Sequence, residues 1–244
     1  MLISDPKARA EATANKRRAV LRFLRDETWS VPDVLAQVAG ITSRQGIHST
    51  LKAMERDDLV KYHSLPIAGR RDLPIWGITS HGLAFSWDEA EEIEDRPRFE
   101  PSRLSLSRVP HQIDLQRARL AAEAAGWTDW QRGERLGFNP PIRPDALVTT
   151  AKGVRVAIEV ERTIKTRQRY QQILGSHLEA IRAQHWLGVI YLTPEGMADR
   201  LRRFVEAVPY ILENGERKEL NESHRRRFRF LELSQFPERQ EGPQ

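Results

Sequence analysis

Hydrophobic residues recur at helical spacing three times in the first part of the chain. In residues 16–26 the apolar positions fall on one side of a helix, which predicts an amphipathic helix. A second helix is predicted from residue 31, with Pro32 in its first turn and Gly40 after its end. A third is predicted over residues 43–56, again with one apolar side. These three short helices should pack together through their apolar sides.

Two apolar stretches follow the third predicted helix. Residues 59–63 and 73–79 flank the turn-forming segment 68–72, which contains glycine. Two such stretches around a turn predict a β-hairpin. Three helices followed by a hairpin predict an N-terminal winged helix-turn-helix domain over residues 1–87.

The apolar pattern is interrupted in residues 88–107. This segment begins with an acidic run and continues with prolines, serines and arginines. Like charges and prolines bury poorly, so we expect a linker between two domains here. The alternative is a solvated helix end that continues from the first domain.

Helical and strand patterns alternate in residues 108–236. Helices are expected over residues 109–125, 163–182 and 194–208, and strands over residues 127–131, 145–150, 155–161, 186–192 and 228–233. This order predicts an α+β protein whose second domain has a mixed central sheet between helices. Residues 237–244 are expected to form a flexible tail.

Composition narrows the class of protein. The chain has 244 residues, a formal net charge of +5 and no cysteine. The absence of cysteine excludes disulfides, thiolate zinc sites and cysteine nucleophiles, and the small basic excess hints at a polyanionic partner. We expect no membrane span and no signal peptide, because no apolar run is long enough and the amino terminus is polar. The expected location is cytoplasmic.

Three carboxylates lie at the ends of two predicted strands. Asp145 opens the first of these strands, and Glu159 and Glu161 close the second. Side chains two residues apart in a strand point the same way, so Glu159 and Glu161 should share one face. Carboxylates this close repel one another unless a cation lies between them, and their hard oxygens favour Mg²⁺ or Mn²⁺. Two ordinary strands with solvated acidic ends are the alternative.

These residues resemble the core pattern of the PD-(D/E)xK nuclease superfamily, in which Pro-Asp, a β-turn and Glu-x-Lys follow one another. Pro144-Asp145 and Glu159 match this pattern, whereas Glu161 stands where the superfamily usually has lysine. The resemblance implies a restriction-endonuclease-like fold with Asp145 and Glu159 as metal ligands. It also makes Glu134 a candidate third ligand, although its neighbouring arginines suit a salt bridge nearly as well.

The wider string of motifs runs from His111-x-x-Asp114 to Arg169-Tyr170. It looks like the plasmid replication-relaxation family, and most like the MobC-type relaxases that initiate transfer of mobilizable plasmids. The resemblance covers roughly residues 108 to 235, and an N-terminal winged helix also occurs in that family. It implies a metal-dependent, site- and strand-specific DNA nickase that acts at a plasmid transfer origin. Its partners would be double-stranded and locally single-stranded plasmid DNA and accessory mobilization or coupling proteins.

Three further residues are candidates for the chemistry. Lys165, four residues after Glu161, is a candidate to supply the missing amine, with an exposed helix residue as the alternative. His111 is a candidate general acid or base, metal ligand or phosphate donor, with a helix-capping role as the alternative. Tyr170 invites comparison with tyrosine nucleophiles, but no histidine triad accompanies it. We therefore favour metal-activated hydrolysis over covalent attack.

Basic and polar side chains outline two candidate DNA-binding surfaces, because such groups reach phosphates and base edges. They are Arg44, Gln45, His48, Lys52, Arg70 and Arg71 in the first domain, and Arg162, Arg167 and Arg169 in the second. Residues 224–229 form a further basic cluster. Solvated helix faces, or a winged helix that binds protein, are the alternatives.

Two other functions remain open at this point. The missing motif lysine makes credible, as the runner-up, a nuclease-fold DNA-binding or plasmid replication-control protein that has lost catalysis. A restriction-like endonuclease that cuts both strands is the third possibility.

Overall fold

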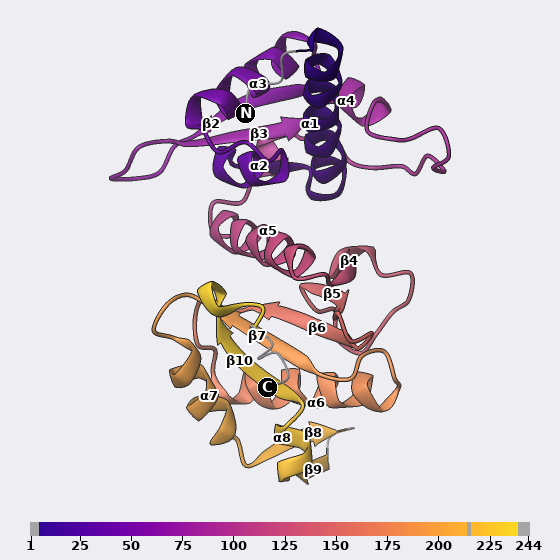
Figure 1. Ribbon diagram of the computed structural model, residues 1–244. Helices are drawn as coiled ribbons and strands as arrows, with labels where there is room; N and C mark the ends of the chain where they lie inside the picture. The colour runs from indigo at the N-terminus through magenta and orange to yellow at the C-terminus, as the bar shows by residue number, and fades with distance from the viewer. Residues whose placement is uncertain (1–4, 214–215, 239–244) are drawn as a thin grey trace, which may run out of the picture. The chain divides into compact units, whose positions relative to one another are not determined.

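The computed structural model of the chain describes residues 5–213 and 216–238 (Figure 1). The chain divides into two compact units between Gln116 and Arg117. Each unit combines helices with strands, so the protein is α+β, as the sequence predicts. The division falls inside helix α5 (Val109–Ala124) and not at residue 108, where the second domain was expected to begin.

Three helices build most of the first unit: α1 (Pro6–Glu27), α2 (Pro32–Val38) and α3 (Arg44–Arg56). Their starts follow from local chemistry, because the side chains of Asp5 and Ser43 accept backbone hydrogen bonds at the first turns of α1 and α3. Helix α1 begins at Pro6 rather than at residue 16, because its first half is polar and has no apolar side that would predict a helix there.

A three-stranded antiparallel sheet completes this unit, in the order β1-β3-β2. Its strands are β1 (Trp29–Ser30), β2 (Val60–Leu65) and β3 (Leu73–Ile78), and the short helix α4 (Ser80–Ala84) follows them. The β2–β3 hairpin lies where the sequence predicts it, whereas β1 and α4 were not expected.

The segment that composition marks as a linker packs against the first unit. Phe99 is buried, and its N–H donates to the carbonyl of Ile78 at 2.9 Å. A Cβ atom on Gly77 would lie 2.0 Å from Cγ of Phe99, so the aromatic ring fills the space that the glycine leaves. Arg25 donates two hydrogen bonds of 3.0 Å to the carboxylate of Glu91. This part of the segment therefore belongs to the first unit.

The 3₁₀ helix η1 (Pro101–Arg103) leads to the start of α5, whose residue Gln116 is also tied to the first unit. The Nε2 atom of Gln116 donates to the carbonyl of Trp29, and Ser30 Oγ donates to Gln116 Oε1, both at 2.7 Å. These bonds are buried, which explains why the unit extends to this residue.

A five-stranded mixed sheet forms the centre of the second unit, in the order β10-β7-β6-β5-β4. The three strands β6, β7 and β10 are parallel, while β4 and β5 run antiparallel to their neighbours. The strands are β4 (Thr128–Arg132), β5 (Ala146–Thr149), β6 (Arg155–Val160), β7 (Val189–Thr193) and β10 (Phe228–Glu232).

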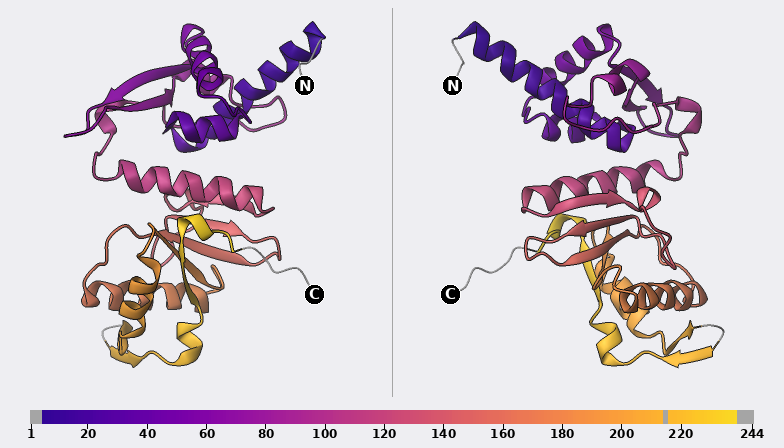
Figure 2. Two further views of the ribbon diagram at one scale, coloured as in Figure 1. Left: turned by 60° about the vertical axis from the view of Figure 1, so that its left-hand side comes forward. Right: turned by 90° about the vertical axis from the view of Figure 1, so that its right-hand side faces the viewer.

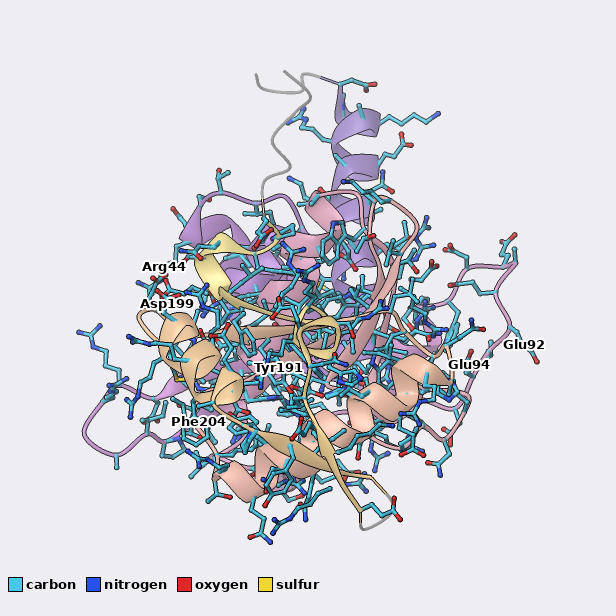
Figure 3. The ribbon with its side chains drawn as sticks, turned by 90° about the horizontal axis from the view of Figure 1, so that it is seen from below. Arg44, Glu92, Glu94, Tyr191, Asp199 and Phe204 are labelled. Atoms are coloured by element: carbon cyan, nitrogen blue, oxygen red, sulfur yellow. The ribbon has the colours of Figure 1, made fainter. Side chains whose placement is uncertain are left out.

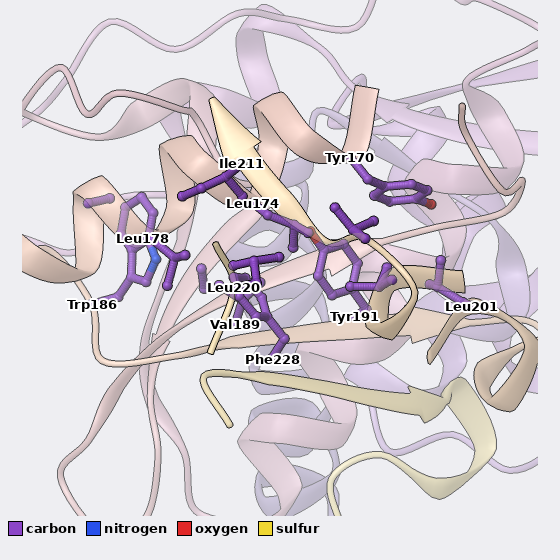
Figure 4. Packing of buried hydrophobic residues seen from close by; sticks show 14 of the residues in the cluster. Tyr170, Leu174, Leu178, Trp186, Val189, Tyr191, Leu201, Ile211, Leu220 and Phe228 are labelled. Carbon is purple, nitrogen blue, oxygen red and sulfur yellow. The ribbon is translucent and has the colours of Figure 1, made fainter. Parts of the chain in front are cut away.

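One face of this sheet carries an apolar stripe across neighbouring strands. Leu147 pairs with Ala157, Ala157 with Val189, and Val189 with Phe228, so these side chains point to the same side. Helices α6 (Arg167–Arg182) and α7 (Ala198–Glu206) contribute apolar residues to the same core. Figure 4 shows part of this cluster. The stripe continues toward Glu159, which is two residues after Ala157.

The remaining elements of the second unit are short and are seen from two sides in Figure 2. They are η2 (Gly133–Arg135), the hairpin of β8 (Tyr210–Glu213) and β9 (Glu216–Glu219), α8 (Glu222–Arg225) and η3 (Leu233–Gln235).

Several predicted boundaries in the second unit differ from the structure. Helix α6 starts at Arg167 and not at 163, because the side chain of Thr166 caps it. Strand β7 starts at Val189 and not at 186, and α7 at Ala198 and not at 194. Of the expected tail, Glu238 forms an ion pair with Arg229, and residues 239–244 lie outside the described residues. None of the helices within the described ranges combines the length and apolar character that crossing a membrane requires.

Candidate functional site

Three carboxylates come together at one end of the paired strands β5 and β6. Asp145 directly precedes β5, Glu159 lies in β6, and Glu161 directly follows it. The register pairs Ala146 with Ile158, which places Asp145 opposite Glu159 on the neighbouring strand. The N–H of Val160 donates to Asp145 Oδ2 at 2.7 Å and holds this carboxylate against β6. By strand alternation, all three carboxylates point toward the face that α6 covers.

A glycine allows the segment after β4 to approach Asp145 closely. The N–H of Gly133 donates to the backbone carbonyl of Asp145 at 3.0 Å, and a Cβ atom here would lie 1.6 Å from the carbonyl oxygen of Pro144. Any other residue would push the chain away. The next residue, Glu134, has a side chain that is 67% exposed and 3.8 Å from Arg132, so the structure places it in a weak salt bridge.

Glu159 is largely buried beside a histidine that sequence reasoning did not identify. Its side chain is 18% exposed, and its Oε1 atom lies 3.1 Å from Nε2 of the fully buried His177 on α6. The two atoms are at ion-pair distance, although they are not aligned as a hydrogen bond. Burial raises the pKa of the Glu159 carboxyl above its ordinary value, against the opposing effect of His177. The charge of Asp145 raises this pKa further, and that of Lys165 lowers it.

Glu161 is held by a lysine and a tyrosine. Its side chain is only 6% exposed, and Lys165 Nζ donates to its Oε2 atom. The hydroxyl of Tyr170 donates to the same oxygen at 3.2 Å and accepts from the Lys165 N–H at 3.4 Å. The carboxylate of Glu161 is therefore neutralised by a lysine four residues further on. The charge of the same lysine also lowers the pKa of the Glu159 carboxyl.

Two buried tyrosines border the carboxylates. Burial, together with the charge of Glu161, raises the pKa of Tyr170. Tyr191 pairs with Glu159 in the β6–β7 register, and burial and the charge of Glu159 raise its pKa well above the ordinary value. Tyr191 lies in the interior of the second unit, whereas Asp199 on α7 faces outward (Figure 3). The hydroxyl of Tyr191 has no hydrogen-bond partner among the described residues.

The position of His177 in the sequence carries a signal that it is a buried polar residue. It lies seven residues after Tyr170, on the side of α6 that carries the buried residues. A histidine in such a position is a polar group that needs a partner inside the protein. The partner could not be named from the sequence, because Glu159 reaches His177 only through the packing of α6 on the sheet.

The donor set at this end of the sheet suits a hard divalent cation. Within residues 5–213 and 216–238, no group of three or more histidine and acidic side chains is arranged to hold a metal ion. Mg²⁺ is commonly held by one or two carboxylates together with water and substrate phosphates. Burial and the repulsion from Asp145 raise the pKa of Glu159, and a cation between the two carboxylates would offset both effects by stabilising the ionised form. These two residues therefore fit Mg²⁺ or Mn²⁺.

The other predicted site residues belong to the first unit or are exposed on the second. His111 is in the first turn of α5, within the first unit, whereas the carboxylates belong to the second. On the surface of α3, Lys52 donates to Glu55 Oε2 at 2.7 Å and lies 5.4 Å from the ring centres of Tyr62 and Trp76. The remaining predicted DNA-binding residues are all exposed: Arg44, Gln45, His48, Arg70, Arg71, Arg162, Arg167 and Arg169.

Comparison with known proteins gives no relative for this chain. No model of a protein family matches it, and no curated protein or solved structure matches it either.

Proposed function

We propose that the second unit is a metal-dependent DNA-cleaving domain of the PD-(D/E)xK type. The observation that carries this proposal is the meeting of Asp145 and Glu159 across two paired strands, with Glu161 and its ion pair to Lys165 directly after the second strand. The order α5-β4-β5-β6-α6-β7, with a mixed sheet, supports a restriction-endonuclease-like fold. The three helices and hairpin of the first unit support a winged helix-turn-helix that selects the DNA sequence.

The chemistry proposed for this site divides between the cation and the protein. A bound divalent ion would supply polarisation of the phosphodiester and activation of a water. Asp145 and Glu159 would hold it, and the buried His177 keeps the Glu159 carboxylate in place. Lys165 neutralises Glu161 and offers an ammonium group to the negative charge of a phosphate.

The proposed activity of the whole chain is strand-specific nicking at a plasmid transfer origin, as in a MobC-type relaxase. The exposed cations of α3 and of the β2–β3 segment would contact duplex DNA, and Arg162, Arg167 and Arg169 would contact the strand near the carboxylates. Accessory mobilization or coupling proteins would complete the reaction in the cell.

A second candidate function has its own supporting observation. Glu161 occupies the position of the usual lysine, and its ion pair engages the amine of Lys165. A protein in which this ion pair persists would bind DNA without cutting it and would act in plasmid replication control.

The test uses a supercoiled plasmid that carries the gene for this chain with its flanking DNA. The purified protein is incubated with it and Mg²⁺ or Mn²⁺, in parallel with Asp145→Ala, Glu159→Ala and the exposed control Asp199→Ala. Open circles formed by wild type and control alone support the nickase. Linear product supports a double-strand endonuclease, and bound but intact plasmid supports the non-catalytic alternative.

A further inference from the structure

A pocket of about 730 Å³ lies in the second unit, away from the carboxylates. It is lined by the turn after β5, by Val154 and Val156 at the start of β6, and by Ile190 near the start of β7. The volume falls within the roughly 300–1,000 Å³ typical of pockets that bind small molecules.

The pocket is separate from the candidate metal site in two ways. Val156 and Glu159 are an odd number of residues apart in β6, so their side chains point to opposite faces of the sheet. From Val154 to Glu159 the strand advances five residues, or about 17 Å at the usual rise. A ligand in this pocket would therefore not be the phosphodiester that the carboxylates cleave.

Four cationic side chains line the pocket: Lys152, Arg226, Arg227 and Arg229. Arg227 Nη1 donates to the carbonyl of Leu187 at 3.1 Å, which holds its guanidinium at the rim. Arg229 is paired with Glu238, the one carboxylate of the lining, and the exposed Arg226 forms an ion pair with Glu222. The excess of positive charge predicts an anionic ligand.

Apolar and aromatic groups form the rest of the wall. Trp127 is half-buried and meets Phe236 edge to face, with ring centres 5.2 Å apart at 85°. Leu187 is exposed at the rim. An indole beside several guanidinium groups suits a ligand that combines a flat ring with phosphates, because bases stack on aromatic side chains while cations contact the backbone.

We propose that this pocket binds single-stranded DNA, with a base against Trp127 and backbone phosphates against Lys152, Arg226 and Arg227. This inference rests on the proposed function, since nicking and local melting would supply a single strand. A concave pocket of this size accommodates a nucleotide or two but not a duplex. It would hold the strand at a distance from the cut and keep it from diffusing away.

The test measures binding of a short fluorescent oligothymidylate by anisotropy, with the full chain in EDTA so that no cleavage occurs. Trp127→Leu should weaken binding about tenfold, because loss of one stacked base is worth that much. Trp127→Phe retains an aromatic ring and should restore most of the affinity. In a plot of the logarithm of the binding constant against the logarithm of the salt concentration, the double variant Lys152→Ala/Arg226→Ala should have a slope shallower by about 1.4. Arg200→Ala/Arg203→Ala on α7 is the control of equal charge, and thermal melting verifies that each variant is folded.

Equal affinity of the pocket variants and the α7 control would overturn the inference. A second result would also overturn it: the wild type does not bind the oligonucleotide but forms a dimer, and Trp127→Leu abolishes that dimer. The pocket would then be a self-association surface. The outcome is independent of the nicking test. Pocket-dependent binding without nicking would reject the proposed function alone, and nicking with pocket variants that bind like the control would reject this inference alone.

Discussion

The Nε2 atom of His177 lies 3.1 Å from Oε1 of Glu159, and the histidine is completely buried. The other ring nitrogen, Nδ1, has no hydrogen-bond partner among the described residues. The carboxylate that we assign to the metal is thus positioned by a side chain of α6, a helix that follows β6 in the chain.

The first prediction concerns the pH dependence of stability. Burial raises the pKa of Glu159 in the folded protein, so this residue contributes most to stability at low pH, and its contribution is lost as the pH rises through the raised pKa. The variant Glu159→Gln should remove this loss, by about 1.4 kcal/mol for each unit by which the pKa is raised. Urea denaturation in EDTA, from about pH 5 to about pH 8, measures the free energy of unfolding of both proteins as a function of pH.

The exposed Glu134→Gln variant is the control and should keep the wild-type dependence on pH. A wild-type and a Glu159→Gln curve that run parallel throughout this range would contradict the assignment. Added Mg²⁺ should stabilise the wild type at high pH more than Glu159→Gln, because a cation binds the ionised carboxylate.

The second prediction tests the structural role of His177. The variant His177→Ala leaves a cavity and a buried carboxylate without its partner, and should lower the free energy of unfolding by about 2–4 kcal/mol. The partly exposed His185, which stacks on Phe138, is the control, and His185→Ala should cost less than about 1 kcal/mol. The variant His177→Gln retains a polar group and should recover nicking better than alanine. Equal stability of the two alanine variants would show that the buried pair contributes nothing.

The third prediction tests the packing of Phe99 on the first unit. A Cβ atom at Gly77 would overlap this ring, so Gly77→Ala should destabilise the protein by about 1–3 kcal/mol. The control is Gly137→Ala, because a Cβ atom there has no neighbour within 4 Å. If residues around Phe99 were a free linker, denaturation curves of both variants would coincide with the wild type.

Much of the second unit could be predicted from the sequence because its central strands are buried. Strands β5 and β6 were located to within two residues, since their apolar runs are bounded by polar turn residues. The hairpin of β8 and β9 escaped prediction, because residues 216–219 are all exposed and have no apolar alternation. The packing of Phe99 was missed for a different reason. A single aromatic side chain fixes this segment to the first unit, and the composition of the surrounding residues does not predict such a contact.

The site was predictable only where it is local in the chain. Glu159 lies on β6, and Asp145 and Glu161 directly flank β5 and β6, two strands joined by a tight turn, so their proximity follows from the sequence pattern. His177 and Tyr191 come from α6 and β7, and only the packing of these elements on β6 brings them to Glu159. Lys165 was identified because it is close to Glu161 in the chain, but its ion pair required the structure.

The fourth prediction concerns Lys165. If its amine serves in place of the motif lysine, Lys165→Ala should reduce nicking by roughly 10²–10⁴-fold, as loss of a group that transfers protons or stabilises charge does. The exposed Lys218→Ala is the control. The variant Lys165→Arg separates two roles, because a guanidinium keeps the charge but cannot act as a base. Near-wild-type nicking by Lys165→Ala would show that the ion pair with Glu161 is structural only.

The last prediction concerns the mechanism and rests on Tyr170. Its hydroxyl donates to Glu161 at 3.2 Å, and its ring is buried in edge-to-face contact with Phe204, 5.7 Å between centres. Burial and the charge of Glu161 raise its pKa, so the hydroxyl stays protonated and is a poor nucleophile. The variant Tyr170→Phe should therefore keep most of the nicking activity and lose about 1 kcal/mol of stability with the hydrogen bond.

Covalent attack by Tyr170 predicts the opposite pattern in the same assay. Phenylalanine has no nucleophilic atom, so Tyr170→Phe would then be inactive, and detergent denaturation of the wild-type reaction would reveal DNA attached to the protein. Both results together would replace hydrolysis by a tyrosine-linked intermediate. The aromatic ring and its packing are kept in the variant, so a loss of nicking in a protein that still melts cooperatively, with only the small loss of stability expected, would be chemical and not structural.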